Sequence, residues 1–359
     1  MTKVGIITYH DINNYGAQLQ AASLQCFLQQ QGYDAELIHY LPPRTRIRVA
    51  GTLLRPLLRG KHRVFSYEWA KRQLFRRSIQ TMARVSSPAL YTSTQVSQYC
   101  REQGFDVLVC GSDELWNFTN YLGYLPPYIL DLDLQPGVKR ISYAASIGSY
   151  AGNPEIDDKM RQALQQFHRI LVRDQHTQEF IHRLGLEGDI VVDPTLIADL
   201  EPEPPVDQDY VLITGGLSPK QRVNVFSFAE SSGLPIITPG NAYPGYEQYH
   251  RLVTPQQWIG LIQNARYHIT SLFHGAAFSL KYATPFACFC TPGKERKIGF
   301  LLSTFGQQER MMPVDAEADA IDARLQQEFP SDYSQVRSRI ITASQNQLLD
   351  ALHAYAEAA

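Results

Sequence analysis

Short apolar runs alternate with longer, helix-periodic segments along most of this 359-residue chain. At its start, the apolar run Val4–Thr8 is followed by a loop, by apolar residues at helical spacing from Leu19 to Leu28, and by a second run at Ala35–His39. Gly32 is placed to end the helix before that second run. This is the order of a βαβ unit, whose strands are parallel because the helix carries the chain back along the sheet. The sequence therefore predicts an α/β fold with parallel sheets.

The alternation continues on both sides of a proline-rich, acidic segment. Residues 201–209 contain three prolines and four acidic residues, a composition typical of a linker. Because a domain commonly has roughly 100–200 residues, we expect an N-terminal α/β domain over 1–200, a C-terminal α/β domain over 210–332 and a C-terminal helix over 333–359. Further strands are expected at Val107–Cys110, Arg140–Tyr143, Arg169–Val172, Ile190–Val192, Tyr210–Thr214, Pro235–Thr238, Tyr267–Thr270 and Pro285–Cys290. Helices are expected at about Pro219–Ser231, Pro255–Asn264 and Gly275–Tyr282.

The composition excludes several classes of protein. With 44% hydrophobic residues the chain is not fibrous or disordered, and its formal charge of −2 argues against a nucleic-acid-binding protein. The five cysteines form no CxxC pair and no His-rich spacing, so we expect buried, reduced thiols and no metal site. No apolar run approaches the roughly 18–20 residues that span a bilayer. Since the chain opens on a strand-like run instead of a signal peptide, we expect a cytoplasmic protein.

The charge is nevertheless concentrated in one segment. Between Arg44 and Arg77 there are eleven basic residues and a single acid, Glu68. Apolar residues are interleaved with these cations: Leu53, Leu54, Leu57, Leu58, Phe65, Trp69 and Phe75. This pattern suits a peripheral contact at the inner face of the cell membrane. The alternative is a solvated, partly flexible insertion, because charge runs are usually exposed faces.

Two loops that follow predicted strands of the first domain carry candidate binding residues. In the first, from His10 to Gly16, Asn14 precedes a helix whose backbone N–H groups could hold an anion or a sugar, and the alternative is a simple helix N-cap. In the second, from Cys110 to Asn117, Asp113 follows a buried strand and Trp116 could stack on a sugar ring. The alternative is that Asp113 caps a following helix and Trp116 belongs to the core.

Two further loops carry ionisable residues. Arg173 directly follows an apolar strand, where a guanidinium can bind a carboxylate or phosphate bidentately, and the alternative is a surface ion pair. His274 lies in the turn between a strand and the helix opened by Gly275, where a near-neutral pKa suits acid–base chemistry. The alternative for His274 is a structural histidine.

These loops belong to a set of short motifs whose order and spacing extend over nearly the whole chain. The motifs are Gly5-Ile-Ile-Thr8, Asn14-Tyr-Gly-Ala-Gln-Leu-Gln20, Gly111-Ser-Asp-Glu-Leu-Trp-Asn117, Tyr143-Ala-Ala-Ser-Ile-Gly148, Val172-Arg-Asp174, Asp193-Pro-Thr195, Phe273-His-Gly-Ala-Ala-Phe-Ser279 and Thr284-Pro-Phe286. Together they resemble the polysaccharide pyruvyl transferase family. The resemblance implies two Rossmann-like α/β domains that face a cleft, as in the GT-B glycosyltransferases.

The resemblance also implies an activity: transfer of pyruvate from phosphoenolpyruvate to a saccharide hydroxyl, giving a pyruvate ketal in cell-surface polysaccharide (exopolysaccharide) biosynthesis. Phosphoenolpyruvate would be a co-substrate, and no cofactor is expected. The expected catalytic residues are His274, which matches the family's functional histidine, and Asp113, which would orient or deprotonate the acceptor. The expected donor-binding residues are Arg173, Gly275, Lys294, Arg296 and Lys297. The expected acceptor-binding residues are Asn14, Tyr15 and Trp116, and the saccharide acceptor could be lipid-linked.

One departure from the family pattern concerns the positions before His274. Family members usually have Asp followed by Ser or Arg there, whereas this chain has Ser271 and Leu272. Either Arg173 and the cluster formed by Lys294, Arg296 and Lys297 supply the positive charge, or donor binding is altered or lost. Two alternatives therefore stay open, a glycosyltransferase that uses a nucleotide sugar and a non-catalytic saccharide-binding paralogue.

Overall fold

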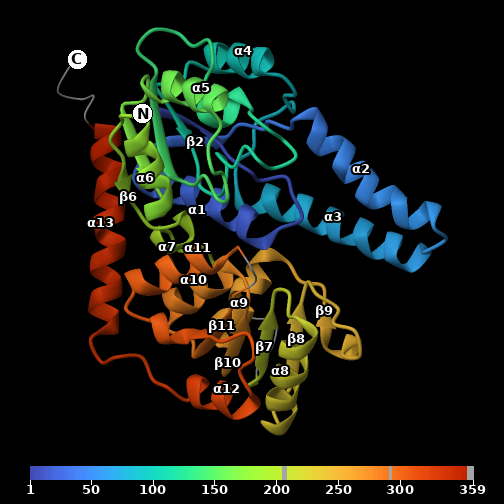
Figure 1. The fold of residues 1–359 in the computed structure, drawn as a ribbon. Helices are drawn as coiled ribbons and strands as arrows, with labels where there is room; N and C mark the ends of the chain where they lie inside the picture. The colour runs from blue at the N-terminus through green and yellow to red at the C-terminus, as the bar shows by residue number, and fades with distance from the viewer. Residues whose placement is uncertain (204–207, 291–292, 354–359) are drawn as a thin grey trace. The chain divides into compact units, whose positions relative to one another are not determined.

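A computed structural model describes residues 1–203, 208–290 and 293–353. The described chain forms two compact units, one made of Met1–Asp199 with the chain from Ile341 onward, the other of Leu200–Ile340. Each unit contains a six-stranded sheet in which every strand pair is parallel (Figure 1). The predicted α/β class with parallel sheets is confirmed.

The sheet of the first unit has the strand order β2-β1-β3-β4-β5-β6. Its strands are β1 (Lys3–Ile7), β2 (Asp34–Leu37), β3 (Val107–Cys110), β4 (Lys139–Ala145), β5 (Arg169–Val172) and β6 (Asp189–Ile190). Its helices are α1 (Tyr15–Gln30), α2 (Pro43–Leu58), α3 (His62–Met82), α4 (Ser93–Gln103), α5 (Pro154–Leu164), α6 (Gln175–Arg183) and α7 (Pro194–Ile197), with the 3-10 helix η1 (Pro126–Ile129). The chain order reverses between β1 and β3, and in open α/β sheets such a switch point is where ligands bind.

The sheet of the second unit has the order β12-β11-β10-β7-β8-β9, the strand order of dinucleotide-binding folds. Its strands are β7 (Val211–Thr214), β8 (Ile236–Pro239), β9 (His250–Arg251), β10 (Tyr267–Thr270), β11 (Phe286–Phe289) and β12 (Met311–Met312). Its helices are α8 (Pro219–Ser231), α9 (Pro255–Asn264), α10 (Phe273–Tyr282), α11 (Glu295–Thr304) and α12 (Ala318–Leu325), with the 3-10 helices η2 (Glu247–Tyr249) and η3 (Gln308–Arg310). The switch point lies between β7 and β10.

Local sequence explains where several elements begin. The central strands β3, β7 and β10 are buried along their whole length, which agrees with the apolar sequences of β3 and β7, while β10 also buries the polar residues His268 and Thr270. Helix α8 starts with a capping box between Ser218 and Gln221, and α9 with one between Thr254 and Gln257. Each has a proline in its first turn, where the missing N–H costs no hydrogen bond.

The basic segment forms two helices that pack against each other, α2 and α3, and most of its residues are exposed (Figure 1). The last helix, α13 (Tyr333–His353), contributes its residues before Ile341 to the second unit and the rest to the first. Residues 204–207 of the expected linker and residues 354–359 of the expected C-terminal helix lie outside the described residues. Within the described parts of the chain, no helix combines the length and the apolar character needed to cross a membrane.

Candidate functional site

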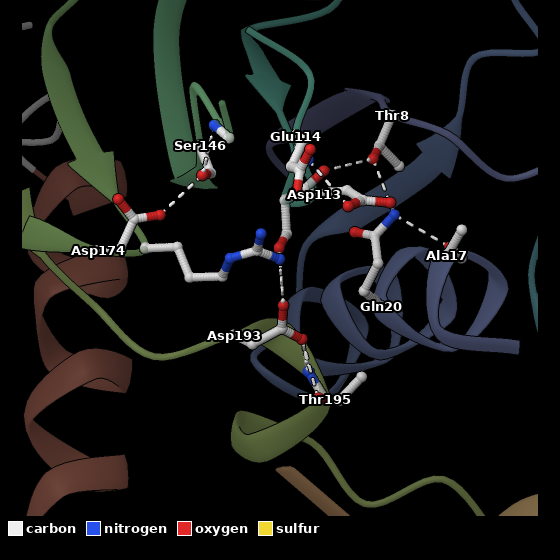
Figure 2. A network of polar contacts seen from close by, with 12 residues as sticks. Thr8, Ala17, Gln20, Asp113, Glu114, Ser146, Asp174, Asp193 and Thr195 are labelled. Atoms are coloured by element: carbon white, nitrogen blue, oxygen red, sulfur yellow. Dashed lines mark hydrogen bonds and ion pairs between the residues drawn. The ribbon is translucent and has the colours of Figure 1, made fainter. Parts of the chain in front are cut away.

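Polar loops meet at the carboxyl edge of the first sheet (Figure 2). The hydroxyl of Thr8, just after β1, donates a hydrogen bond to the carbonyl of Ser112, just after β3, at 3.1 Å, and so joins the two strands that flank the switch point. The amide of Gln20 on α1 donates to the same hydroxyl at 2.9 Å. The loops after β4, β5 and β6 add Ser146, Asp174 and Asp193.

A buried ion pair lies at the centre of this edge. The Nη1 atom of Arg173 is 3.2 Å from Oδ2 of Asp193, and both side chains are almost completely excluded from solvent. Asp193 also accepts hydrogen bonds from the hydroxyl of Ser112 at 2.9 Å and from the backbone N–H and hydroxyl of Thr195 at 3.1 and 2.8 Å. Arg173 therefore forms an ion pair, but the alternative of a surface ion pair is wrong because this pair is buried.

Further carboxylates surround Arg173. Burial alone lowers the pKa of its guanidinium, but the negative charges of Asp193, Asp113, Asp174 and Glu114 outweigh burial and raise that pKa above its ordinary value. The guanidinium therefore holds several carboxylates together at one edge of the sheet. A group of acids needs such a cation to stay compact.

A second hydrogen-bonded cluster fixes the loop after β4. The hydroxyl of Ser146 donates to Asp174 at 2.7 Å, and Asp174 accepts from the backbone N–H and hydroxyl of Thr177 at 2.8 Å each. The turn then continues into Gly148, whose φ of +57° is costly for any residue with a side chain. A Cβ there would lie 2.4 Å from Oε2 of Glu114, so this carboxylate would have to move if the position carried a side chain.

Asp113 has a backbone that an aspartate rarely adopts. Its φ is +82°, and its side chain accepts a hydrogen bond from the backbone N–H of Glu114 at 2.8 Å. The alternative in which Asp113 caps a following helix is wrong, because the stretch from β3 to β4, described throughout, contains only the 3-10 helix η1. Left-handed backbone at a non-glycine residue is concentrated at functional sites, where the surrounding contacts hold it in place.

Of the three expected acceptor residues, Asn14 is exposed, whereas Tyr15 and Trp116 are buried. Asn14 forms the N-cap of α1 by accepting from the backbone N–H of Ala17 at 3.3 Å. Tyr15 is buried against the ring of Phe75, with the centroids 4.8 Å apart. Trp116 is fully buried and donates its indole N–H to a carbonyl, so the alternative of a core tryptophan is confirmed. Stacking of Trp116 on a sugar is not supported by this buried position.

The first loop also contains an ionic cluster that the sequence did not predict. Asp11 is buried and lies 2.7 Å from Nη2 of Arg72 on α3, and its backbone carbonyl accepts from Nη1 of the same arginine at 2.9 Å. Nε2 of His39 is 3.7 Å from the other carboxylate oxygen. Burial lowers the pKa of the neighbouring His10 to about 4. These contacts join the loop to the basic helical segment.

The candidate site of the second unit lies at its own switch point. His274 and Gly275 are in the first turn of α10, directly after β10. A Cβ at Gly275 would lie 2.1 Å from the hydroxyl oxygen of Thr270, so glycine lets the helix pack closely on the end of the strand. His274 is half-buried, with its ring edge against the ring of Phe273.

A buried histidine behind this helix supports it. His268 on β10 shares hydrogen bonds with Ser279 of α10 at 2.7 Å and with Thr214 of β7 at 2.9 Å. Burial lowers the pKa of His268 to about 3, so its ring is neutral. His268 therefore ties the helix that carries His274 to the two strands of the switch point.

The structure brings part of the predicted cation cluster to this helix. Nζ of Lys297 on α11 lies 6.0 Å from the ring centroid of Phe273, the neighbour of His274. Lys294 is the N-cap residue of α11, and Arg296 is exposed. Leu272, at the position that departs from the family pattern, offers only its backbone, which donates to the hydroxyl of Thr270 at 3.1 Å. Among the described residues, no group of three or more His, Cys, Asp or Glu side chains is placed to hold a metal ion.

Solved structures share this two-unit architecture. The UDP-N-acetylglucosamine 2-epimerase from Rickettsia bellii matches with a TM-score of 0.53 at 11% identity, over 99% of this chain and 97% of its own. The UDP-GlcNAc 2-epimerase from Neisseria meningitidis, solved bound to UDP-GlcNAc, matches with a TM-score of 0.51 at 10% identity, over 98% and 99%. At these identities the likeness concerns the fold alone. The shared fold is the expected one, with two Rossmann-like domains of the GT-B type.

The family is defined by sequence. A search of curated proteins gave no match. The sequence profile described as polysaccharide pyruvyl transferase matches residues 14–289, which is most of the chain. The chain belongs to the polysaccharide pyruvyl transferase family, a family of transferases that act on saccharides, and the resemblance stated from the motifs is confirmed.

Proposed function

We propose that the protein transfers the pyruvyl group of phosphoenolpyruvate to two hydroxyls of one saccharide, as a step of cell-surface polysaccharide biosynthesis. The observation that carries this proposal is the family match, which extends from Asn14 at the first switch point past His274 at the second. Polar and ionisable side chains at the carboxyl ends of both sheets support it, because ligands of open α/β sheets bind there.

The reaction sets chemical requirements that the candidate residues meet. One saccharide hydroxyl adds to the enol carbon of phosphoenolpyruvate while a proton is added to its methylene carbon, which becomes a methyl group. Loss of phosphate and attack by the second hydroxyl then close the ketal. Two hydroxyl protons are lost in the reaction. One is matched by the proton that the methylene carbon gains, and the other leaves with the phosphate. The site therefore needs an acid, a base and positive charge for two anionic groups.

In this proposal the second unit holds the donor. The backbone N–H groups at the start of α10, opened by Gly275, attract an anion, and Lys297, Lys294 and Arg296 of the neighbouring segment add positive charge. His274 protonates the methylene carbon or the leaving phosphate. A direct contact between Arg173 and the donor stays a prediction, whereas its ion pair with Asp193 supports a role in holding the carboxylates.

The first unit binds the acceptor in this proposal. Asp113, held in left-handed backbone beside the carboxylate cluster, orients or deprotonates the attacking hydroxyl. Asn14 and Tyr15, at the start of α1, shape the loop next to it. We further propose that the acceptor is lipid-linked and that the protein acts at the inner face of the cell membrane.

The test measures phosphate release and product mass with phosphoenolpyruvate and a panel of saccharides. His274→Ala should abolish the pyruvylated product, because it removes the proposed acid. The matched control is His182→Ala, which removes an exposed histidine of α6 and should leave turnover unchanged. Consumption of a nucleotide sugar in place of phosphoenolpyruvate, or saccharide binding without turnover that is indifferent to His274→Ala, would contradict the proposal.

A further inference from the structure

Helices α2 and α3 form a hairpin, residues 43–82, that projects from the first unit (Figure 1). Ten large hydrophobic side chains are exposed among the described residues, and six of them lie in this hairpin. They are Ile47, Leu54, Leu57, Leu58, Val64 and Trp69. Single exposed apolar residues are ordinary, but a gathering of them on one projecting element indicates a surface that meets a partner.

The spacing on α2 separates apolar and basic side chains. Ile47, Leu54 and Leu58 stand at positions i, i+7 and i+11, so they form one stripe along the helix. An adjacent stripe at i, i+4, i+11 and i+15 consists of arginines: Arg44, Arg48, Arg55 and Arg59. The half-buried Leu53 and Pro56 lie on the opposite side of the helix. The exposed side of α2 is therefore amphipathic.

The tip of the hairpin, residues 55–63, contains four basic residues and no acidic residue that could neutralise them. From Arg44 to Tyr67 there are seven basic residues and no acidic one. Four cations at the tip are exposed, and none of them forms an ion pair within the described chain: Arg55, Arg59, Lys61 and Arg63. At the base of the hairpin, by contrast, Arg72 is paired with Asp11 at 2.7 Å. These cations are therefore available to a partner that supplies negative charge.

We propose that the α2–α3 hairpin docks the protein onto an anionic lipid bilayer, with Leu54, Leu58 and Trp69 entering the headgroup region and the tip cations facing the acidic headgroups. A bilayer matches both features of the surface, because it offers apolar depth as well as negative charge. A nucleic acid would satisfy the cations but would leave the aliphatic stripe in water.

The base of the hairpin joins this docking surface to the candidate acceptor loop. The amide of Gln18 on α1 donates to the backbone carbonyl of Phe75 on α3 at 2.9 Å. The rings of Tyr15 and Phe75 are in contact, and Arg72 is paired with Asp11. Docking would thus hold the β1–α1 loop close to the membrane, where a lipid-linked saccharide is presented. This consequence, unlike the docking itself, rests on the proposed function.

The protein carries its own reporter of docking. Of its three tryptophans, Trp116 and Trp258 are fully buried, whereas Trp69 is 49% exposed.

The protein is titrated with phosphatidylcholine vesicles that contain about 30% phosphatidylglycerol and with pure phosphatidylcholine vesicles. The expected result is a blue shift of the emission and co-sedimentation with the anionic vesicles alone. Binding should weaken as salt shortens the screening length to about 10 Å at 0.1 M. Trp69→Phe should remove the shift and leave most of the binding.

Variants assign the binding to the hairpin. The double variant Arg59→Gln with Lys61→Gln should lower the affinity for vesicles about 25-fold, because each cation near an anionic surface contributes a factor of about five. Leu54→Ser with Leu58→Ser should weaken it further. The matched control, Lys220→Gln with Val223→Ser, removes an exposed cation and an exposed apolar side chain from α8 and should change nothing.

Three results would overturn the proposal. They are no binding to anionic vesicles at low salt, equal loss of binding in the hairpin and control variants, and hairpin-dependent binding of an oligonucleotide without any shift on vesicles. All variants alter exposed side chains, and circular dichroism checks that they fold. Because no donor and no turnover are involved, failure of docking is distinguishable from failure of the proposed reaction.

Discussion

Breaking the buried ion pair between Arg173 and Asp193 should destabilise the first unit by several kcal/mol. Both side chains are excluded from water, and removing one partner of a buried pair costs about 3–5 kcal/mol because the other charge stays buried. The two substitutions should differ. After Asp193→Asn the guanidinium still faces Asp113, Asp174 and Glu114, so we expect a cost near 3 kcal/mol. Arg173→Met leaves the carboxylates without their cation, so we expect about 5 kcal/mol.

Chemical unfolding followed by fluorescence and circular dichroism measures these costs. Trp116 is buried in the first unit and reports its unfolding. The double variant should cost at least about 1 kcal/mol less than the sum of the two single variants, because partners of one ion pair are coupled. The control is the exposed pair Arg169 and Asp189 at the edge of the same sheet, 2.7 Å apart, whose removal should cost less than about 1 kcal/mol. Equal costs for the buried and the exposed pair, or strict additivity in the buried pair, would refute this reasoning.

Three further predictions concern the glycine turn, acid stability and membrane docking. Gly148→Ala should destabilise the first unit by about 1–3 kcal/mol through its positive φ and the clash with Glu114, and should lower transfer activity; unfolding free energies and turnover equal to wild type would contradict it. In the folded protein His268 has a pKa of about 3, against an ordinary 6.5, so on acidification the unfolded chain takes up this proton before the folded protein does. The contribution of neutral His268 to the stability of the fold is therefore complete above pH 6.5 and decreases as the pH falls towards 3. Between pH 6.5 and about 5 this loss is about 2 kcal/mol. The check is the free energy of unfolding of His268→Asn as a function of pH. This free energy should depend less on pH than that of wild type or of the exposed-site control His182→Asn. An unchanged slope of unfolding free energy against pH would contradict the prediction. Arg59→Gln with Lys61→Gln should lower transfer to a glycolipid embedded in anionic vesicles while leaving transfer to a soluble saccharide unchanged; equal loss on both acceptors would argue for damage to the site itself.

Much of the fold could be predicted because its signals are local. The strands Val107–Cys110 and Tyr267–Thr270 were predicted at their observed bounds, since Val107–Cys110 is a compact apolar run and Tyr267–Thr270 is rich in aromatic and β-branched residues. The helices Pro219–Ser231 and Pro255–Asn264 were also predicted at their bounds, because a proline in the first turn marks their beginning. The edge strands β9 and β12, two residues each, were missed. They are defined by pairing with a neighbour and are too short to give a strand pattern of their own.

The candidate site was predictable in position but not in its contacts. Loops after buried strands indicated Asp113, Arg173 and His274, whereas the partners that explain them lie far away in sequence. Asp193 is 20 residues from Arg173, and Arg72 is 61 residues from Asp11. Pairings at such separations depend on the folded sheet and helices. Asp193 and Ser146 had one available signal, since each lies in a motif of the family resemblance, although no role was assigned to either.

The left-handed backbone of Asp113 was beyond local reasoning as well. An aspartate after a strand favours a helix cap, and the chain instead turns into an irregular loop held by the residue that follows β4, Ser146, which donates its N–H to the Asp113 carbonyl at 3.0 Å. Trp116 illustrates the same limit. Its sequence neighbours suggested a sugar platform, while its tertiary contacts place it in the core.

The most direct test of the central claim follows the donor carbon into the product. Phosphoenolpyruvate with a heavy-carbon label at its enol carbon is incubated with the protein and a saccharide acceptor in deuterated water, and the saccharide is examined by NMR and mass spectrometry. The account predicts that the labelled carbon becomes the ketal carbon of the saccharide, that its methyl group gains one solvent deuterium, and that His274→Ala gives neither. Label recovered only as unreacted donor or free pyruvate, across acceptors to which the protein binds, would contradict pyruvyl transfer.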